Sequence, residues 1–265
     1  MMGFGRLVRG IAFGGAMLLA TAGATAQGLP KLLIIECGST APTAEMTASG
    51  KFASVDQFDA CSATPTLAAL LAYDAILAFS NSPPTNPSGL GDVLADAVDA
   101  GRYVTIATYG MSLSWAITGR MQTTGYNPLI VASNADVSGS LAAVVPTDPI
   151  FTGVSLASVV YFHNSNFAHP NLDAGATLLA TDGAGVNMIA RSASGRVMGM
   201  NLYPDATIGN NAEFFKLVAN VASNNASGTP PAPPQEIPTL SEWALIAMAL
   251  FVAGIAGFSL RRQTR

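Results

Sequence analysis

The stretch from Ala75 to Thr108 constrains the fold of this chain more than any other part of the sequence. It begins with a continuous apolar run, AILAF, of the kind found in buried strands. Asn86 and Pro87 then form the start signal of a helix, and Gly101 forms its stop signal. The apolar residues between these signals recur on one helical face: Leu90, Val93, Leu94, Ala97 and Val98. A second apolar run, YVTIAT, follows from Tyr103. This spacing predicts a βαβ unit, and therefore a mainly parallel sheet in an α/β fold.

The segments before this unit extend the same pattern. KLLIIE (Lys31–Glu36) is another continuous apolar run, which is typical of a strand inside a parallel sheet. KFASVDQFD (51–59) alternates between apolar and polar residues and predicts a more marginal strand. Further on, Thr64 as N-cap and Pro65 at the first helical position predict a short helix.

Beyond Gly110 the pattern loosens, and residues 111–121 predict a short helix. Three later segments predict strands: 177–181, 187–193 and 196–204. Ser194 and Gly195 join the last two as a hairpin. Residues 211–224 predict a final amphipathic helix, whose apolar side chains are expected to face inward: Phe214, Phe215, Val218 and Val221.

The charge of the central part argues against a nucleic acid partner. From Gln27 to Ser227 there are 7 Lys and Arg residues against 14 Asp and Glu residues, a net charge of −7. A nucleic-acid-binding surface needs clustered basic side chains to neutralise phosphates, and this segment contains no basic patch or stripe.

The N-terminal residues have the three parts of a secretory signal peptide. Arg6 and Arg9 precede an apolar run from Ile11 to Leu19, and small residues follow at 24–26. We therefore predict a signal peptide at 1–26, cleaved after Ala26. The alternative is an uncleaved anchor, but the apolar run is short for a membrane span.

Export makes the two cysteines interpretable. Cys37 and Cys61 are the only cysteines, and both lie in the exported part. An even number of cysteines in an oxidising compartment favours a disulfide, which would stabilise the fold by roughly 3 kcal/mol. A reactive thiol at Cys37 is the alternative; it is disfavoured because no His lies nearby in the sequence.

The C-terminal part consists of a linker and an apolar segment. Residues 225–236 are rich in Pro, which favours an extended spacer, so the α/β domain is expected to span 27–224. Residues 243–260 contain no charge, and as a helix they would reach about 27 Å, enough to cross a bilayer core. Trp243 lies at one end of this segment and Arg261 and Arg262 at the other, which predicts a transmembrane helix with a cytoplasmic C-terminus.

Eight residues before, within and after this apolar segment form a motif: Ile237, Pro238, Thr239, Leu240, Ser241, Trp243, Arg261 and Arg262. Together they closely resemble a known sorting signal, the IPTL-CTERM domain of exported proteins of Gram-negative bacteria. The resemblance covers 237–265 and implies recognition by an exosortase-type membrane transpeptidase. The precursor would be anchored in the inner membrane and the domain then passed to the cell surface or released. A permanent anchor remains the alternative.

Three segments of the central domain carry a further pattern: residues 73–108, PIFTGV (149–154) and GRVMGMNLYPD (195–205). In these segments the domain resembles the class I glutamine amidotransferase-like superfamily. The resemblance implies a flavodoxin-like fold with helices on both faces of the sheet. The Gly-x-Cys-x-Gly turn of working amidotransferases is absent after YVTIAT, where Tyr109 and Gly110 stand, and so is the His-x-Glu pair. No catalytic residue, cofactor or metal is therefore assigned.

Three further features could be taken for functional sites, and each has a simpler interpretation. His163 and His169 suggest a metal site with Asp173 as a candidate third ligand, but polar loop histidines are the simpler interpretation. The aspartates of the helix after Asn86 are interpreted as solvated surface: Asp92, Asp96 and Asp99. Ser112 lacks the G-x-S-x-G pattern of a nucleophile elbow.

In flavodoxin-like folds the carboxyl ends of the parallel strands form the usual ligand crevice. Asn81, Tyr109 and Met111 are expected to line it. The sequence thus predicts an exported envelope or surface protein whose α/β domain has a binding or structural role. An extracellular enzyme acting on envelope or matrix carbohydrate is the alternative.

Overall fold

Strands and helices alternate along the first half of the chain, as the sequence predicts. The computed structural model describes residues 28–226. Its ten strands are β1 (Lys31–Glu36), β2 (Ser54–Asp59), β3 (Ala75–Ala78), β4 (Tyr103–Ala107), β5 (Leu129–Asn134), β6 (Leu141–Ala143), β7 (Ala168–Leu172), β8 (Thr177–Asp182), β9 (Asn187–Arg191) and β10 (Val197–Met200). The α-helices of this part are α1 (Thr43–Ala48), α2 (Leu67–Leu70), α3 (Pro87–Asp99) and α4 (Ala212–Ala226). Three 3₁₀ helices are η1 (Gly119–Gln122), η2 (Pro149–Phe151) and η3 (Leu156–Ser158).

Eight of these strands form one mostly parallel sheet, in the order β2-β1-β3-β4-β10-β9-β8-β6. The first five are parallel to one another, and the last three continue the sheet as antiparallel strands. β5 and β7 form a separate antiparallel pair. The predicted βαβ unit is confirmed as β3-α3-β4, and the hairpin predicted at Ser194 and Gly195 joins β9 to β10.

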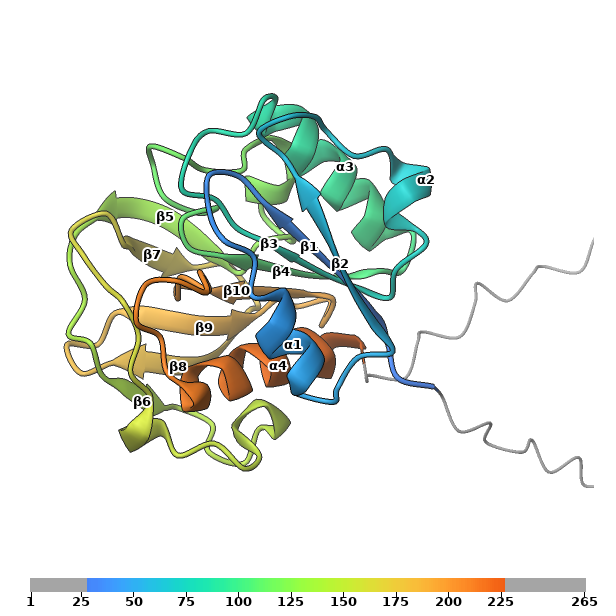
Figure 1. Cartoon of the computed structure of the whole chain (residues 1–265). Helices are drawn as coiled ribbons and strands as arrows, with labels where there is room; N and C mark the ends of the chain where they lie inside the picture. Colours follow the sequence, from blue (N-terminus) through green and yellow to red (C-terminus); the bar gives the residue numbers. More distant parts are fainter. Residues whose placement is uncertain (1–27, 227–265) are drawn as a thin grey trace, which may run out of the picture.

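Helices cover both faces of the sheet, with α1 and α4 on one side and α2 and α3 on the other (Figure 1). The alternation of side chains along β1 explains this arrangement. Leu32 and Ile34 belong to the core beneath α4, whereas Leu33 and Ile35 belong to the core beneath α3. The two ends of the described chain lie at the same end of the domain (Figure 1).

The helix signals predict the start of α3 correctly and that of α2 wrongly. The Asn86 side chain accepts a hydrogen bond from the Gly89 N–H at 3.0 Å, as an N-cap does. In α2 the cap is Thr66, whose hydroxyl accepts from the Ala69 N–H at 3.3 Å, and not Thr64. The reason is that Pro65 is buried ahead of the helix, which starts later than predicted.

The helix predicted at 111–121 does not form as such. This segment contains turns, and a short 3₁₀ helix, η1, covers only its end. Arg120 of η1 explains the three aspartates of α3. Its guanidinium pairs with Asp96 and Asp99, and its backbone N–H donates to Asp92 at 2.8 Å. These aspartates therefore hold the segment after β4 against α3, which the interpretation as solvated surface missed.

Several predicted segments lie outside residues 28–226: the signal peptide (1–26), most of the linker (225–236) and the sorting tail (237–265). The predicted transmembrane helix at 243–260 belongs to that tail. Across the part of the chain that the structure describes, no helix is long and apolar enough to span a membrane. α4 continues to Ala226, two residues past the expected domain end at Asn224.

Candidate functional site

The loops that follow β1, β2, β3 and β10 line an open hollow of about 570 Å³, which we call the strand-end crevice. Parallel strands bring these loops together because their carboxyl ends all lie at the same edge of the sheet. Its polar lining includes Glu36, Ser39, Asp59, Asn81, Tyr203 and Asp205. Glu36 is the last residue of β1 and Asp59 the last residue of β2.

Hydrogen bonds across the crevice hold the loop after β1 against the segment after β10. The hydroxyl groups of Ser39 and Tyr203 are 2.8 Å apart. The Thr40 N–H donates to the Asp205 carboxylate at 2.7 Å, and the Tyr203 hydroxyl donates to the same carboxylate at 3.2 Å. Burial raises the pKa of the Tyr203 phenol above its ordinary value, so this group remains a hydrogen-bond donor at neutral pH.

The opposite wall is acidic and more open. Glu36 is buried, and its carboxylate accepts from the Ser39 N–H at 3.0 Å and from the Gln57 amide at 3.1 Å. Asp59 is exposed. The Ser62 hydroxyl and the Cys61 N–H hold the pKa of Asp59 below its ordinary value, so it is charged at neutral pH.

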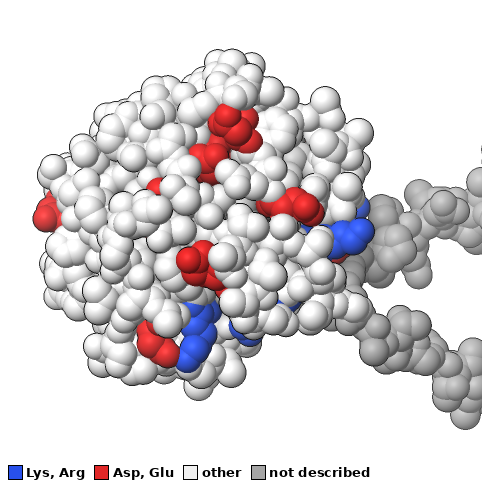
Figure 2. Space-filling view, viewed as in Figure 1, with Lys and Arg blue, Asp and Glu red and all other residues white. Residues whose placement is uncertain are grey.

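The lining of the strand-end crevice contains three carboxylates and no Lys or Arg. Near the top of the face shown in Figure 2, over the region where β1 and β2 end, the coloured side chains are likewise acidic. Such a surface repels anions and offers acceptors to hydrogen-bond donors. The crevice is therefore suited to neutral or cationic ligands that carry several donors.

The structure places the three predicted crevice residues differently from one another. Asn81 is exposed and lines the crevice. Tyr109 and Met111 are only 2% and 0% exposed, and neither is among the lining residues, so their predicted position was wrong. The reason is that the chain turns inward after β4 and buries both side chains.

Tyr109 belongs to a cluster of aromatic rings beside the crevice. Its ring centroid lies 4.9 Å from that of Tyr203, 5.0 Å from that of Trp115 and 5.5 Å from that of Phe167. Its hydroxyl lies 2.8 Å from the Asn164 side-chain oxygen, and burial raises its pKa to about 12. Packed aromatic rings thus fill the place after β4 where the amidotransferase resemblance would require a nucleophile.

The two cysteines are joined as a disulfide in the structure, with an S–S distance of 1.96 Å and a Cα–Cα distance of 4.8 Å. The bond connects the residue that follows β1 to the loop that follows β2. Cys37 is fully buried, whereas Cys61 is exposed and lines the strand-end crevice.

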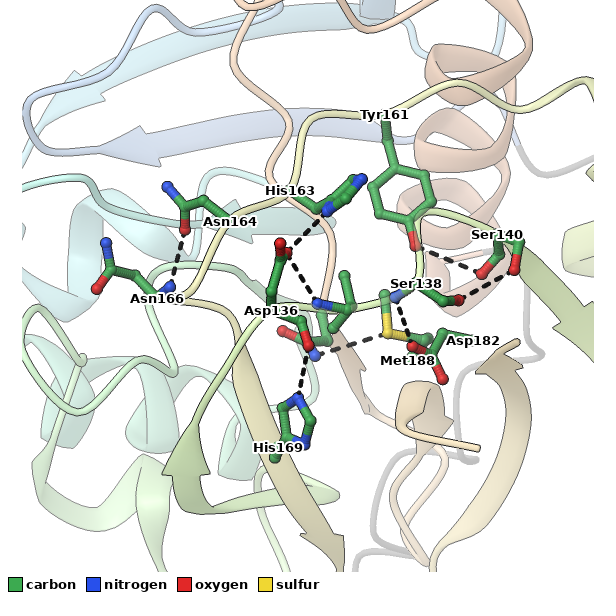
Figure 3. Close-up of polar contacts among 12 residues, drawn as sticks. Asp136, Ser138, Ser140, Tyr161, His163, Asn164, Asn166, His169, Asp182 and Met188 are labelled. Carbon is green, nitrogen blue, oxygen red and sulfur yellow. Dashed lines mark hydrogen bonds and ion pairs between the residues drawn. The ribbon is translucent and has the colours of Figure 1, made fainter. Parts of the chain in front are cut away.

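His163 lies in a loop and His169 in strand β7, and both contact Asp136 (Figure 3). His163 Nδ1 lies 2.8 Å from the Asp136 carboxylate, and His169 Nε2 lies 3.1 Å from the Asp136 backbone oxygen. Asp173, the candidate third ligand, instead accepts a hydrogen bond from the Gly125 N–H. Within residues 28–226, no three His, Cys, Asp or Glu side chains are grouped in a way that would hold a metal ion.

Asp182, the last residue of β8, lies nearby and holds two loops together (Figure 3). Its buried carboxylate accepts three backbone N–H groups, from Ser138 at 2.8 Å, Ala184 at 2.9 Å and Val186 at 2.7 Å. Burial alone would raise the pKa of Asp182, but the N–H groups of Ser138, Val186 and Ala184 outweigh it, and the pKa is lowered.

We expect Asp182→Asn to destabilise the protein by about 1–3 kcal/mol at pH 7, because an amide satisfies these donors poorly. Because the pKa of Asp182 is lower in the folded than in the unfolded state, its charge stabilises the fold at pH values above the unfolded-state pKa. That stabilisation is lost as the pH falls through the folded-state pKa. The stability difference between wild type and variant should therefore shrink below about pH 4. Urea unfolding from pH 3 to 7 measures it. Asp56→Asn, at an exposed carboxylate, is the control, and a difference constant with pH would contradict the prediction.

The sequence reading missed most of the crevice. Glu36 and Asp59 are charged residues placed directly at the ends of predicted strands, so a signal for them was present. Asp205 and Tyr203 follow β10 within GRVMGMNLYPD (195–205), a segment that indicates the fold but predicts no role for either residue. Ser39 carried no signal, because its role depends on the approach of Tyr203, which is 164 residues away in the sequence.

Comparison with solved structures supports the fold. A candidate GMP synthase subunit from Thermoplasma acidophilum aligns with a TM-score of 0.50 at 12% identity, over 74% of this chain and 95% of that chain. A candidate ThuA-like protein from Bacteroides uniformis aligns with a TM-score of 0.48 at 10% identity, over 76% of this chain and 93% of that chain. A glutamine amidotransferase from Methylobacillus flagellatus aligns with a TM-score of 0.47 at 11% identity, over 66% of this chain and 70% of that chain. At these identities the Thermoplasma alignment shows a shared fold, in agreement with the glutamine amidotransferase-like resemblance.

Comparison of sequences identifies the tail rather than the domain. No curated protein matches this chain. Residues 237–262, however, match the IPTL-CTERM motif, which agrees with the resemblance noted at Ile237–Ser241. This C-terminal sorting motif points to an exported, surface-directed protein.

Proposed function

We propose that this chain is a cell-envelope protein whose tail is processed by an exosortase-type enzyme and whose α/β domain is a non-catalytic binding module. The observation that carries the proposal is the match of residues 237–262 to the IPTL-CTERM motif. The signal-peptide pattern at 1–26 and the uncharged segment at 243–260 support it, since a sorting tail requires both export and a membrane stop.

In this proposal the apolar segment holds the motif at the outer membrane face while the sorting enzyme acts. Pro238 would keep the motif extended and accessible. The domain would then leave the membrane helix behind and reach the cell surface or the medium.

The intact mass of the protein recovered from its native host tests this part. We expect a chain that starts at Gln27 and ends within or before 237–243 in the surface or extracellular fraction. Pro238→Ala combined with Leu240→Ala should leave a chain that runs to Arg265 in the inner membrane. Glu236→Gln, just outside the motif, is the matched control. A wild-type mass that runs to Arg265 and occurs only in the inner membrane would instead make the tail a permanent anchor.

For the domain, we propose the strand-end crevice as the binding site. Its lining of carboxylates, hydroxyl groups and the Asn81 amide supports a donor-rich ligand of the envelope or matrix. The position of the crevice also fits display: it lies at the carboxyl ends of the strands, whereas β1 begins, and α4 ends, at the other end of the domain (Figure 1). The aromatic cluster around Tyr109 supports a binding rather than a catalytic role.

Binding to an array of purified envelope and matrix polysaccharides and cationic peptides tests the crevice. Asn81→Trp places a large ring in the crevice and should weaken any binding by at least about tenfold. Ala53→Trp adds the same side chain at an exposed position near the start of β2 and should leave binding unchanged. Equal binding by both variants would rule the crevice out.

A further inference from the structure

We propose that the Cys37–Cys61 disulfide shapes the strand-end crevice, so that the crevice becomes competent only after the chain enters an oxidising compartment. This inference rests on the proposed function in one respect, which is that the crevice is the binding site. It concerns the β1, β2 and β3 side of the crevice, which we call the cysteine wall: residues 36–37, 59–62 and 81–85.

The contacts of the cysteine wall converge on the two disulfide-bonded residues. The Asn81 N–H donates to the Cys37 carbonyl at 2.7 Å, which places Asn81 in the lining. The Thr85 hydroxyl donates to the Cys61 carbonyl, and the Thr85 N–H donates to the Ala60 carbonyl at 3.0 Å. Movement of either cysteine would therefore displace the loop that begins directly after Asp59 and the loop that carries Asn81.

Apart from the hydrogen bonds from Thr85 and the local ones to Asp59, the loop that carries Cys61 has little support from packing. It follows β2, which is an edge strand with β1 as its only neighbour in the sheet. Residues 61–63 are all exposed, so few packing contacts hold them. Segments with exposed backbone and few buried contacts open at low free energy when a restraint is removed.

The other side of the crevice does not depend on the disulfide. Ser39 is hydrogen-bonded to Tyr203, and Thr40 to Asp205, as described above. Tyr203 is in turn packed against Tyr109. Reduction should therefore loosen one side of the crevice and leave the other in place, which makes the effect local.

Formation of the disulfide requires an external oxidant. Forming the bond from two thiols releases two protons and two electrons, which a disulfide-bonded oxidase of the exporting compartment would accept. In reverse, a phosphine attacks the exposed Cys61 sulfur and, with one water, yields two thiols and the phosphine oxide. Cys37 is buried, so attack at Cys61 is the accessible route.

Hydrogen exchange of the full-length chain in detergent, oxidised and after phosphine reduction, tests the proposal without any ligand. Alkylation and mass measurement verify that both thiols are free. We expect exchange at the Asn81 and Thr85 amides to rise by at least about tenfold, with β4, β10 and α4 unchanged. Untreated Cys37→Ala/Cys61→Ala should reproduce the pattern.

Two results would overturn the proposal. An equal rise in the exchange rate in every element would show that the disulfide stabilises the whole fold. No rise at Asn81 and Thr85 would show that the cysteine wall keeps its structure without the disulfide. Because exchange is measured without ligand, either result leaves the proposed binding function standing. Conversely, a crevice that binds nothing would leave the exchange result unaffected.

Discussion

Gly91→Ala is expected to destabilise this protein by about 3 kcal/mol, although alanine is the better helix former by about 1 kcal/mol. Gly91 is buried in α3, and a Cβ at this position would lie 1.6 Å from the Thr118 carbonyl oxygen. That oxygen cannot move away easily, because the Thr118 N–H donates to the Pro87 carbonyl and the Ile117 N–H to the Gly110 carbonyl. The clash must separate α3 from the segment after β4.

Urea unfolding followed by circular dichroism measures this effect. Ser88→Ala, at an exposed position one turn earlier in α3, is the control and should change the free energy of unfolding by less than about 0.5 kcal/mol. A Gly91→Ala variant as stable as wild type, or more stable, would show that α3 and the Thr118 carbonyl are not in close contact.

Asp148→Ala should destabilise by about 2–3 kcal/mol, because it breaks the most buried ion pair of residues 28–226. Asp148 accepts two hydrogen bonds from the Arg191 guanidinium, at 2.8 and 3.1 Å, and its side chain is only 7% exposed. The variant leaves a cation without its partner and also removes the cap on the Ile150 N–H. The Arg191 side chain is 28% exposed, so water offsets part of the loss.

The matched comparison is Glu213→Gln, which breaks the ion pair with Lys216, a pair more exposed than the Asp148–Arg191 pair. Exposed pairs contribute little, so we expect a loss below about 1 kcal/mol. Thermal and urea unfolding of both variants shows which substitution lowers the free energy of unfolding more. If the two losses are equal, burial of the Asp148–Arg191 pair contributes nothing, and the explanation fails.

The elements of the fold could be predicted where the local pattern alone decides them. The apolar runs at Lys31–Glu36 and Tyr103–Thr108 become central strands because nothing but a sheet covered on both faces can bury them. The Asn86-Pro87 signal starts α3 because its hydrogen bonds are local. At α2 the helix starts later than predicted, because Pro65 is buried ahead of the helix and Thr66 is the cap.

The crevice was predictable in place but not in composition. The fold class places a ligand site at the carboxyl ends of the strands, and Asn81 was found there. Tyr109 was misplaced because its burial depends on rings from Trp115, Phe167 and Tyr203, which are far from one another in the sequence. No periodicity in the sequence encodes such a meeting.

The sequence by itself points to an exported, surface-directed protein, since the IPTL-CTERM motif is a short linear segment at 237–262. It also determined the α/β class, because hydrophobic period and helix caps act over a few residues. Only the tertiary structure decided which polar groups meet. Glu36, Asp59 and Asp205 line one crevice because parallel strands end at the same edge of the sheet, and the disulfide joins two of those strand ends. Contacts of that kind depend on how the chain packs in three dimensions, which no local pattern in the sequence specifies.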